Sequence, residues 1–565
     1  MANEIVIVKP EKCVGCNACI RSCPAPEANV TTKVAEGKYI TSVDTSKCIA
    51  CGACLASCAH GARDYIDDTD SCMAKLASNE KMIIIAAPAL KTVLPNQWKG
   101  VLDWFRKKGC IVYDVSLGAD ICTWAHLRAI ENDVVGNVMS QPCPAIVKYV
   151  ETYQPTILQH NFSPIHSPMS CLAVYIKKYQ RRTNPIAAIS PCIAKKYEFS
   201  DTGLIDYNVT IKKLMDYFEK NDIKIPTHDE KDLSYNFDDQ QGQLGGIYPR
   251  PGGLRDTLLN HDPEMNIINA EGVHTVYPQI DMYARMPDSK HPRVFDVLSC
   301  EFGCNVGPGT GTKQNIFDIR TTMTEVEREA RSRMKSGGGL FNRGGEDRLF
   351  KYFDDELQLA DFMRAYKGSM PTRIPSPADL EPIYLSMGKE TEEERHHDCK
   401  ACGYQSCREM AIAIFRKLNM PENCLVYAQK MLKVEQKELT SDNTRLADIT
   451  KECTELSEKL RERLGQIDEH MDSIEKSTTK TSTRAGEVNN LLQNIIEFCS
   501  ENPTMDADSV TQLVSILETT QKAFGSLDKN VARTNESSAV INQSIVDIRG
   551  LVDSINGVLS AEGTH

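Results

Sequence analysis

Regularly spaced cysteines are the residues of this sequence best suited to chemistry. The 565-residue chain contains 22 cysteines, and two of its segments, CVGCNACIRSCP and CIACGACLASC, share the spacing C-x2-C-x2-C-x3-C. A four-iron cubane needs four thiolate ligands, of which one tight loop can supply three. Two complete copies about 35 residues apart argue against chance and against zinc. Both runs therefore predict iron–sulfur clusters that move single electrons.

The paired runs resemble two-cluster ferredoxins, in which the fourth thiolate of each run crosses to the other cluster. The resemblance implies that the first cluster takes three ligands from the first run and one from the second: Cys13, Cys16, Cys19 and Cys58. The second cluster then takes the remaining four: Cys48, Cys51, Cys54 and Cys23.

A second set of cysteines is spread over three distant segments. Cys143 lies in SQPCP, Cys192 in SPCIAKKYE, and Cys300 and Cys304 in LSCEFGCNVGPG. Each follows a strand-like run or lies in a loop rich in proline or glycine, and an α/β fold presents ligands at the carboxyl ends of its strands. Four thiolates again match a cubane, so the three loops are predicted to close around one cofactor.

From residue 1 to about 320 the chain resembles the iron-only ([FeFe]) hydrogenases. The resemblance is carried by the two-cluster head, the three cysteine loops and the strings APAL, GAD, SPM and PGGL in that order. It implies that Cys143, Cys192, Cys300 and Cys304 hold the cubane of an H-cluster. It also implies that Cys304 bridges to a two-iron subsite bearing CO, CN⁻ and an azadithiolate.

The resemblance assigns roles to four further residues. Lys195 matches a lysine that pairs with a cyanide ligand, and a buried ammonium needs such an anionic partner. Glu198 matches the glutamate that fixes the same loop. Pro88 and Ala89 match backbone positions beside the other cyanide.

Several positions depart from the pattern of fast hydrogenases. A proton-relaying cysteine precedes the first cluster ligand in those enzymes, but here the position is Pro142, which has no titratable group. The carboxylate expected in the helix after GAD is replaced by Ala125 and His126, while Ser190 and Leu298 stand at methionine positions. Loss of a positioned proton transfer typically costs about 10²–10⁴-fold in rate. We therefore expect slow H2 chemistry, as in the sensory branch of the family.

A fourth cysteine cluster follows the hydrogenase-like region. Its members are spaced C-x2-C-x4-C-x16-C: Cys399, Cys402, Cys407 and Cys424. The string CKACGYQSC resembles a small four-iron domain of corrinoid proteins, carbon-monoxide-handling proteins and some sensory hydrogenases. Zinc stays open as an alternative, because four thiolates also suit that ion, and His396 and His397 are possible competing ligands. The position of this cluster suggests an electron exit or a redox reporter.

The C-terminal part of the sequence is polar and helical. From Val510 to Leu559, apolar, Thr and Ser residues recur at alternating steps of three and four, which predicts a coiled-coil seam. Upstream, a second row recurs every seven residues: Leu439, Leu446, Cys453, Leu460, Ile467 and Ile474. Pro503 is predicted to separate the two helices. They form either a hairpin or strands of a homodimer.

Composition excludes several classes of protein. A net charge of −12, a pI near 5.6 and the lack of a Lys/Arg-dense block argue against nucleic acid as a partner. No apolar run reaches the roughly 18 residues of a membrane span, and the N-terminus lacks the profile of a signal peptide. Dense cysteines without a secretory signal indicate metal or redox work in the cytoplasm of an anaerobe.

These patterns predict a multidomain α/β protein of four parts. They are a ferredoxin-like domain with two [4Fe-4S] clusters (1–75), an α/β H-cluster domain (76–370), a small α-helical [4Fe-4S] domain (385–428) and a coiled-coil tail (429–565), with SMPTRIPSPADLEP as a linker. The total is four [4Fe-4S] clusters plus the two-iron subsite.

Three functions remain open. The first is an H2-responsive redox sensor whose tail addresses a signalling kinase or phosphatase, or a partner hydrogenase. The second is a ferredoxin-linked hydrogenase that interconverts H2 with protons and reduced ferredoxin. The third is a non-catalytic electron-transfer or cluster-assembly protein. The missing relay favours the first over the second, the retained Lys195 and Glu198 favour the first two over the third, and the tail disfavours the second.

Overall fold

A four-stranded parallel sheet forms the centre of the computed structural model, which describes residues 4–35, 38–227, 237–312, 314–336, 345–368, 375–501 and 506–562. Its strand order is β6-β5-β8-β9, with β5 at Ile83–Ala86, β6 at Ile111–Asp114, β8 at Ile186–Ser190 and β9 at Tyr207–Thr210. The apolar runs MIIIAAPA, CIVYDVS and PIAAIS have the sequence pattern of buried strands, and the structure confirms them as β5, β6 and β8. β5 and β8 are buried at every residue, as expected for a parallel sheet covered on both faces.

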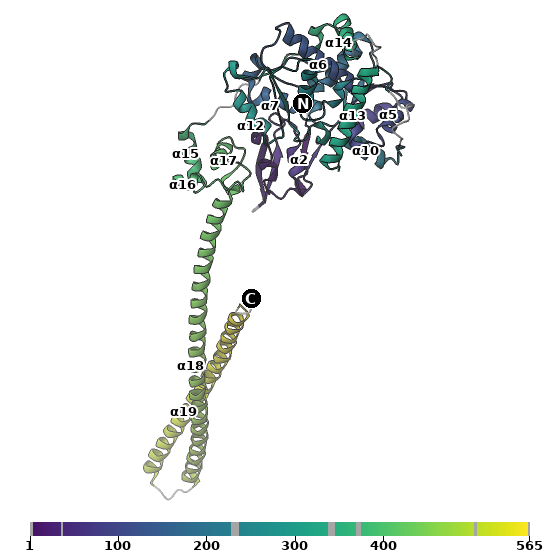
Figure 1. Ribbon diagram of the computed structural model, residues 1–565. Helices are drawn as coiled ribbons and strands as arrows, with labels where there is room; N and C mark the ends of the chain where they lie inside the picture. The colour runs from purple at the N-terminus through teal and green to yellow at the C-terminus, as the bar shows by residue number, and fades with distance from the viewer. Residues whose placement is uncertain are drawn as a thin grey trace. The chain divides into compact units, whose positions relative to one another are not determined.

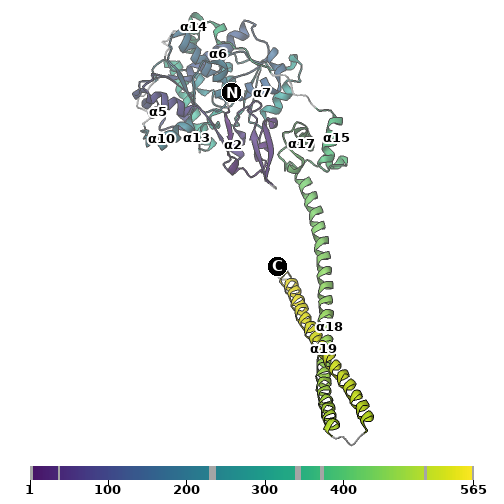
Figure 2. The same ribbon diagram turned by 180° about the vertical axis from the view of Figure 1, so that it is seen from behind.

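Helices cover both faces of this sheet. On one face, α3 (Thr69–Ala77), α5 (Trp98–Lys107) and α10 (Ile211–Lys220) pack on Ile84, Val112 and Ile189. α5 and α10 lie close together in Figures 1 and 2. On the other face, α6 (Val115–Glu131) and α8 (Pro168–Val174) pack on Ile83 and Ile85. The core is therefore a three-layer α/β structure.

A second parallel sheet lies in the same unit. Its order is β10-β11-β7, formed by Ile267–Glu271, Val294–Leu298 and Val138–Met139. The helices that surround the two sheets are α4 (Ala89–Val93), α7 (Pro144–Tyr153), α9 (Lys195–Thr202), α11 (Gly253–His261), α12 (Val276–Tyr283), α13 (Ile316–Ser336) and α14 (Gly345–Glu356). Two parallel sheets thus supply the strand ends from which the cysteine loops leave.

The N-terminal head repeats one small motif. α1 (Ala18–Arg21) and α2 (Ala53–Ser57) each follow a residue with positive φ, Asn17 or Gly52. The Oγ atoms of Ser22 and Ser57 lie 2.8 Å apart across the repeat. Two antiparallel pairs complete the head: β1 (Val6–Val8) with β4 (Arg63–Tyr65), and β2 (Asn29–Ala35) with β3 (Lys38–Val43).

The fourth cysteine cluster lies in a small helical domain built from α15 (Pro377–Ser386), α16 (Glu392–Arg395) and α17 (Cys407–Phe415). The prediction that SMPTRIPSPADLEP is a linker is wrong for its second half, because α15 begins at Pro377. Ser376 accepts a hydrogen bond from the Asp379 backbone in a capping box, and Pro377 occupies the first turn, where proline favours a helix. α15 then buries Leu380 against Cys402 and Cys424.

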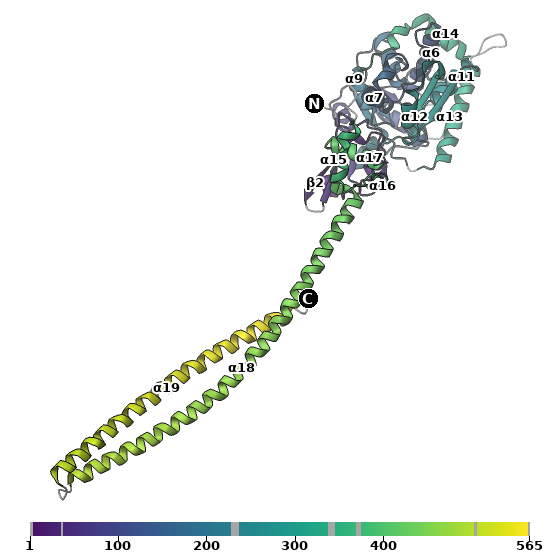
Figure 3. The ribbon, with the colours of Figure 1, turned by 90° about the vertical axis from the view of Figure 1, so that its left-hand side faces the viewer.

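Residues 431–565 form a unit separate from residues 1–430. Most of α18 (Leu425–Glu501) and all of α19 (Ala507–Glu562) belong to it, and the two helices run antiparallel, as Figure 3 shows. Ile545 of α19 packs with Leu464 and Met471 of α18. Pro503, the predicted helix breaker, lies outside the described residues.

The hairpin buries only part of the predicted seams. On α19 the buried positions are seven residues apart and belong to the predicted row: Val531, Ser538, Ile545 and Val552. On α18 the prediction is wrong in register, because Leu439, Leu446 and Cys453 are exposed. The buried row is Ser457, Leu464, Met471, Ala485 and Leu492. Across the described residues, no helix has the length and apolar character needed to cross a membrane.

Candidate iron–sulfur sites

Four loops at strand ends enclose one cavity in the core. It contains about 760 Å³ of space free of protein atoms, part of which is open to solvent. The loops follow β5, β7, β8 and β11, and each leaves the carboxyl end of a parallel strand. The four predicted cysteines all line this cavity: Cys143, Cys192, Cys300 and Cys304.

Local backbone structure holds each cysteine at the cavity wall. Cys143 is the N-cap of α7, which Pro144 opens. The backbone N–H of Cys304 donates to the carbonyl of Pro249 at 2.7 Å. Gly303 has φ +80°, and a Cβ there would lie 2.1 Å from the same carbonyl oxygen. The Gly-Cys pair of the third loop is therefore fixed by a close backbone contact that only glycine permits.

The cavity disfavours ionised thiols unless a cation is present. Burial is the main cause that raises the pKa of Cys192 to about 12, and the neighbouring Cys143 adds to it. Burial likewise raises the pKa values of Cys300 and Cys304, and each also feels the charges of Cys143 and Cys192. Iron would supply the missing positive charge, because metal binding displaces thiol protons. The chemistry of this donor set therefore fits a cluster.

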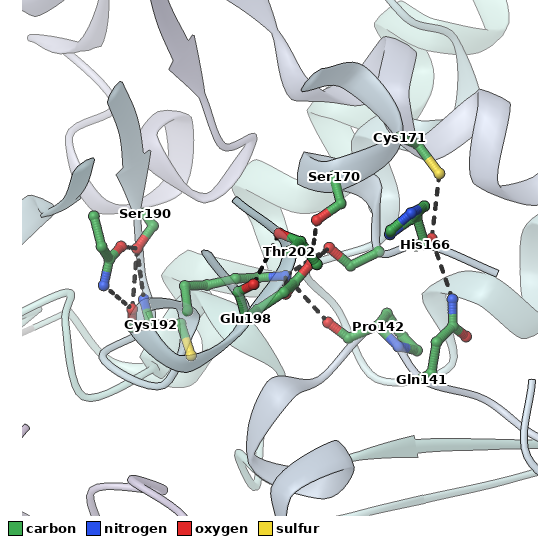
Figure 4. A network of polar contacts seen from close by, with 12 residues as sticks. Gln141, Pro142, His166, Ser170, Cys171, Ser190, Cys192, Glu198 and Thr202 are labelled. Atoms are coloured by element: carbon green, nitrogen blue, oxygen red, sulfur yellow. Dashed lines mark hydrogen bonds and ion pairs between the residues drawn. The ribbon is translucent and has the colours of Figure 1, made fainter. Parts of the chain in front are cut away.

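One ammonium group, that of Lys195, reaches the cavity. Figure 4 shows the polar contacts around Glu198 and Pro142. Lys195 lines the cavity and donates to Glu198 Oε2 at 2.6 Å, to Ser167 Oγ at 2.8 Å and to the carbonyl of Pro142 at 3.4 Å. Glu198 also accepts from Ser167 and, at 2.5 Å, from Ser170. Burial alone would raise the pKa of Glu198, but the charge of Lys195 and these hydrogen bonds outweigh it and lower the pKa. The pair is thus a buried, fully bonded ion pair.

Of the two other residues predicted at the cavity, one lines it and one does not. Pro88 lines the cavity, whereas Ala89 is buried as the first residue of α4 and does not line it. Pro142 and Leu298 form part of the wall. The structure therefore brings together the cysteines, Lys195 and Pro88, with Glu198 one contact behind.

A polar network lies behind this wall. His126 is fully buried, and its Nε2 lies 2.8 Å from Ser163 Oγ. Cys122 and Cys171 both donate to the carbonyl of His166, at 3.4 and 3.2 Å. None of these five residues lines the cavity among the residues the structure describes. Cys122 and Cys171 are both buried.

The head brings its cysteines into two groups. Burial is the main cause that raises the pKa of Cys23, and the charges of Cys54 and Cys48 raise it further. The pKa of Cys51 is raised by burial and then by the charge of Cys23. Cys23 of the first run therefore lies with the cysteines of the second run, as a crossed ligand pattern requires. Cys19 in turn feels Cys13 and Cys16.

Arg63 was not singled out by any sequence motif, yet it lies inside the head. Its side chain donates to Cys19 Sγ at 3.1 Å, to Thr41 O at 3.0 Å and to Asn29 Oδ1 at 3.3 Å. Burial opposes ionisation of Cys58, but three backbone hydrogen bonds, one of them from Arg63, and then the charge of Arg63 outweigh it and lower the pKa of this thiol. Its Nη1 is buried and has no hydrogen-bond partner among the described residues. An anionic cluster would supply that missing acceptor.

The second head group adjoins the core cavity. Cys23 and three second-run cysteines, Cys48, Cys51 and Cys54, pack in the same apolar cluster as Cys143, Cys192 and Cys304. A Cβ on Gly52 would lie 2.4 Å from Pro308 Cβ. The charge of Cys51 contributes to the raised pKa of Cys300, after burial and the nearer cysteines. The two sites are therefore neighbours.

The C-terminal cysteines line a cavity of their own, with about 300 Å³ free of protein atoms. All four take part: Cys399, Cys402, Cys407 and Cys424. His396 and His397 do not line it among the described residues. Buried Lys389 does, and its ammonium donates to Glu394 O at 2.6 Å.

Across the described part of the chain, no three His, Cys, Asp or Glu side chains are grouped closely enough for a single metal ion. Thiolates on one zinc ion lie about 3.8 Å apart, from a Zn–S bond of about 2.3 Å and tetrahedral geometry. The thiolates of a cubane lie farther apart, because each binds a different iron. The spacing of the cysteines in the described residues therefore does not suit one ion shared by three side chains.

A thiol-lined cavity at the strand ends of an α/β core, beside a head in which Cys23 of the first run lies with cysteines of the second run, defines an iron–sulfur redox protein. Residues 80–308 match the family described as iron only hydrogenase large subunit, C-terminal domain. Residues 5–59 match the 4Fe-4S dicluster domain, and residues 396–426 match an Fe-S cluster family. The chain is an [FeFe]-hydrogenase-like iron–sulfur protein. No curated protein matches it significantly.

Solved structures similar to this chain include [FeFe]-hydrogenases. Two variants of the [FeFe]-hydrogenase HydA1 from Chlamydomonas reinhardtii share 14% and 15% identity, with TM-scores of 0.38 and 0.39. Each comparison covers 54% of this chain and 100% of the other. A structure from a study of stepwise H-cluster assembly matches with 14% identity, the same coverage and a TM-score of 0.39.

Proposed function

We propose that this protein is an H2-responsive redox sensor that turns over H2 slowly. The proposal includes four [4Fe-4S] clusters on the cysteine sets described above and a two-iron subsite with CO, CN⁻ and azadithiolate beside Cys304. When bound, that subsite supplies the heterolytic cleavage of H2. Lys195 and Glu198 are assigned to holding the subsite, because their ion pair places a buried ammonium at the cavity.

The composition of the cavity wall carries the proposal. Besides the four cysteines, the described lining residues include only two titratable side chains, Lys195 and Tyr248. Lys195 is engaged by Glu198, and burial raises the pKa of Tyr248 well above its usual value. General acid–base catalysis needs a group whose pKa lies near the working pH. At the position of Pro142 the wall offers none, so fast proton delivery is not supported.

The proposed division of labour follows the chain. Residues 1–75 relay electrons, residues 76–370 hold the H-cluster, residues 385–428 hold the C-terminal cluster, and residues 429–565 form the output. The expected partners are H2, a ferredoxin or another redox protein, and a signalling kinase or phosphatase or a partner hydrogenase in the cytoplasm.

A second copy of the chain is the proposed partner of the tail. The hairpin buries Ile545 but leaves Ile541, Ile548 and Ile555 of the same seam 44%, 38% and 49% exposed. These residues continue the alternating three- and four-residue steps of a coiled coil. Another hairpin would cover them, which supports a homodimer.

The first test is the infrared spectrum of the anaerobically matured protein with and without H2. Sharp CO and CN⁻ bands that shift with H2 are expected. Absence of such bands at full iron–sulfur loading would contradict both the sensor and the hydrogenase, and would leave an electron-transfer or assembly protein.

Pro142→Cys tests the argument about rate, and Pro142→Ser is its matched control. The two side chains have nearly the same size, but only the thiol titrates near neutral pH. We expect Pro142→Cys to raise H2 turnover by at least tenfold and Pro142→Ser to leave it near the wild-type rate. Equal rates in both fully matured variants would refute the relay argument.

A catalytic hydrogenase is the second candidate, and the network behind the wall favours it. Burial opposes ionisation of Cys122, but hydrogen bonding with Cys171 and the charge of His126 outweigh it and lower its pKa to about 5. His126 also contacts Ser163. If these groups carry protons to the cavity, the wild type should turn over H2 rapidly and His126→Phe should lower that rate. Slow H2 turnover in the wild type that His126→Phe leaves unchanged would support the sensor.

A further inference from the structure

The C-terminal cluster domain is docked on one part of the head. Thr31 of β2 donates its backbone N–H to Leu418 O at 2.8 Å. Arg416, which follows α17, forms an ion pair with Glu27 of the head. Ile20 of α1 is 1% exposed because it packs among α15 and α17, together with Met410 and Cys402. Backbone, charge and apolar contacts thus join the same two surfaces.

Two further hydrogen bonds connect the cysteine loops themselves. Asn17 follows Cys16, Asn423 precedes Cys424, and the two asparagines exchange hydrogen bonds at 2.8 and 3.2 Å. A predicted ligand on each side is therefore the direct chain neighbour of one member of a reciprocal amide pair. This arrangement gives a short bonded route between the loops of the two clusters.

A glycine permits this approach. Gly403 follows Cys402 and has φ +97°. A Cβ there would lie 2.7 Å from Ile20 Cβ and 2.9 Å from Asn17 O. The loop that carries Cys402 therefore lies directly on α1, closer than any other residue type would allow.

The far side of this interface leads into a long helix. Cys424 directly precedes Leu425, the first residue of α18, and accepts the backbone N–H of Ala428 in the first turn. A helix N-terminus carries a partial positive charge of roughly half a unit. A cluster that gains an electron at Cys424 would change the charge held at that end of α18.

We infer that the C-terminal cluster is the built-in electron acceptor of the head. With clusters bound, electrons from the core site would reach the cluster held by the second-run cysteines and then the one held by the first-run cysteines. They would cross at Asn17 and Asn423 to a cluster held by Cys424. That last transfer would oxidise the first-run cluster by one electron and reduce the C-terminal cluster by one, with no bond or proton transferred. The source of the electrons, H2, rests on the proposed function; the docked acceptor does not.

A charge swap at the interface tests the route. Glu27→Arg and Arg416→Glu each place like charges opposite one another, and the double variant restores an opposite pair. The readout is the electron paramagnetic resonance spectrum of the anaerobic, iron-loaded full chain, frozen at increasing times after photochemical reduction by a deazaflavin. Because this reductant replaces H2, the result is independent of the two-iron subsite.

In the wild type we expect reduction of the C-terminal cluster to follow that of the head, and spin–spin broadening between them at full reduction. Each single variant should lose the broadening and slow the reduction of the C-terminal cluster at least tenfold, and the double variant should regain both. Unchanged spectra and rates in both single variants would overturn the inference. Hydrogen exchange at Thr31 shows whether the variants undock, since its amide is protected by the interface; undocking without a change in rate would also overturn it. Failure of H2 alone to reduce any cluster would instead count against the proposed function.

Discussion

Replacement of Arg63 tests whether the head is tuned to pass electrons toward the first-run cluster. Arg63 is 8% exposed and donates to Cys19 Sγ at 3.1 Å. Arg63→Met removes the charge but keeps an unbranched apolar side chain. Arg63→Lys retains the charge and serves as the control.

The size of the effect follows from Coulomb's law. The cluster spreads its charge beyond Cys19, so we take a separation of about 6 Å and an effective dielectric constant of about 20, which give ~3 kcal/mol. For a one-electron couple, a tenfold change in the equilibrium constant is about 59 mV, so this energy corresponds to roughly 120 mV. Because a nearby cation stabilises the more negative, reduced cluster, Arg63→Met should lower the midpoint potential by about 100 mV.

The assay is a potentiometric titration of the dithionite-reducible clusters followed by electron paramagnetic resonance, with iron content measured for each variant. We expect the cluster on Cys19 to shift most in Arg63→Met and little in Arg63→Lys. If all head clusters of an iron-replete Arg63→Met protein titrate within about 30 mV of wild type, the electrostatic reasoning is refuted.

Three substitutions and one change of pH have clear expected outcomes. Glu198→Gln leaves the Lys195 ammonium buried without its counterion and should destabilise the core by about 3–5 kcal/mol in chemical denaturation, as for other broken buried pairs; a loss below about 1 kcal/mol would contradict the role of the pair. The pKa of Glu198 is lowered in the folded state from its ordinary value of 4.5. Its contribution to stability is therefore complete above that unfolded value and is lost as the pH falls through the folded value. Thermal melting should show no loss from this group between pH 7 and 5 and a decline only in stronger acid. Cys424→Ser should remove one cluster's iron while the head signals persist; loss of all clusters would indicate a general folding defect. Ile548→Asp on α19 should shift a dimer toward monomer in analytical ultracentrifugation, whereas Ser544→Asp on the same helix is the control, and equal masses in all three proteins would exclude the proposed tail interface.

Local sequence patterns were enough to predict the strands of the core, because the residue types of each segment favour the same structure that its packing requires. Ile83–Ala86 and Ile186–Ser190 read as buried strands, and both are. The cysteine loops that follow such strands were expected to converge, since carboxyl ends of parallel strands meet at one edge. Their convergence on one cavity needed two sheets, which periodicity alone does not reveal.

Contacts between distant segments explain what the sequence did not predict. Arg63 lies in GARDY, where nothing distinguishes it from a surface arginine, and only the fold brings it to Cys19. Ser376 to Pro382 contains the residue types of a linker, but a capping box and burial of Leu380 turn it into a helix. On α18 the heptad row containing Leu439 was as plausible as the row containing Leu464; packing on α19 selected the latter.

The carbonyl group of Pro142 links the proton chemistry of the core cavity to the position of Lys195. Pro142 supplies no proton donor of its own, yet its carbonyl accepts a hydrogen bond from Lys195. The same ammonium is held by Glu198 and Ser167. A cysteine at position 142 restores a titratable group and also frees the backbone from proline's fixed φ. The gain in proton transfer from Pro142→Cys must therefore be read against Pro142→Ser, which carries the same backbone change: only the difference between the two variants reports on the thiol, and any change common to both reports on the position of Lys195.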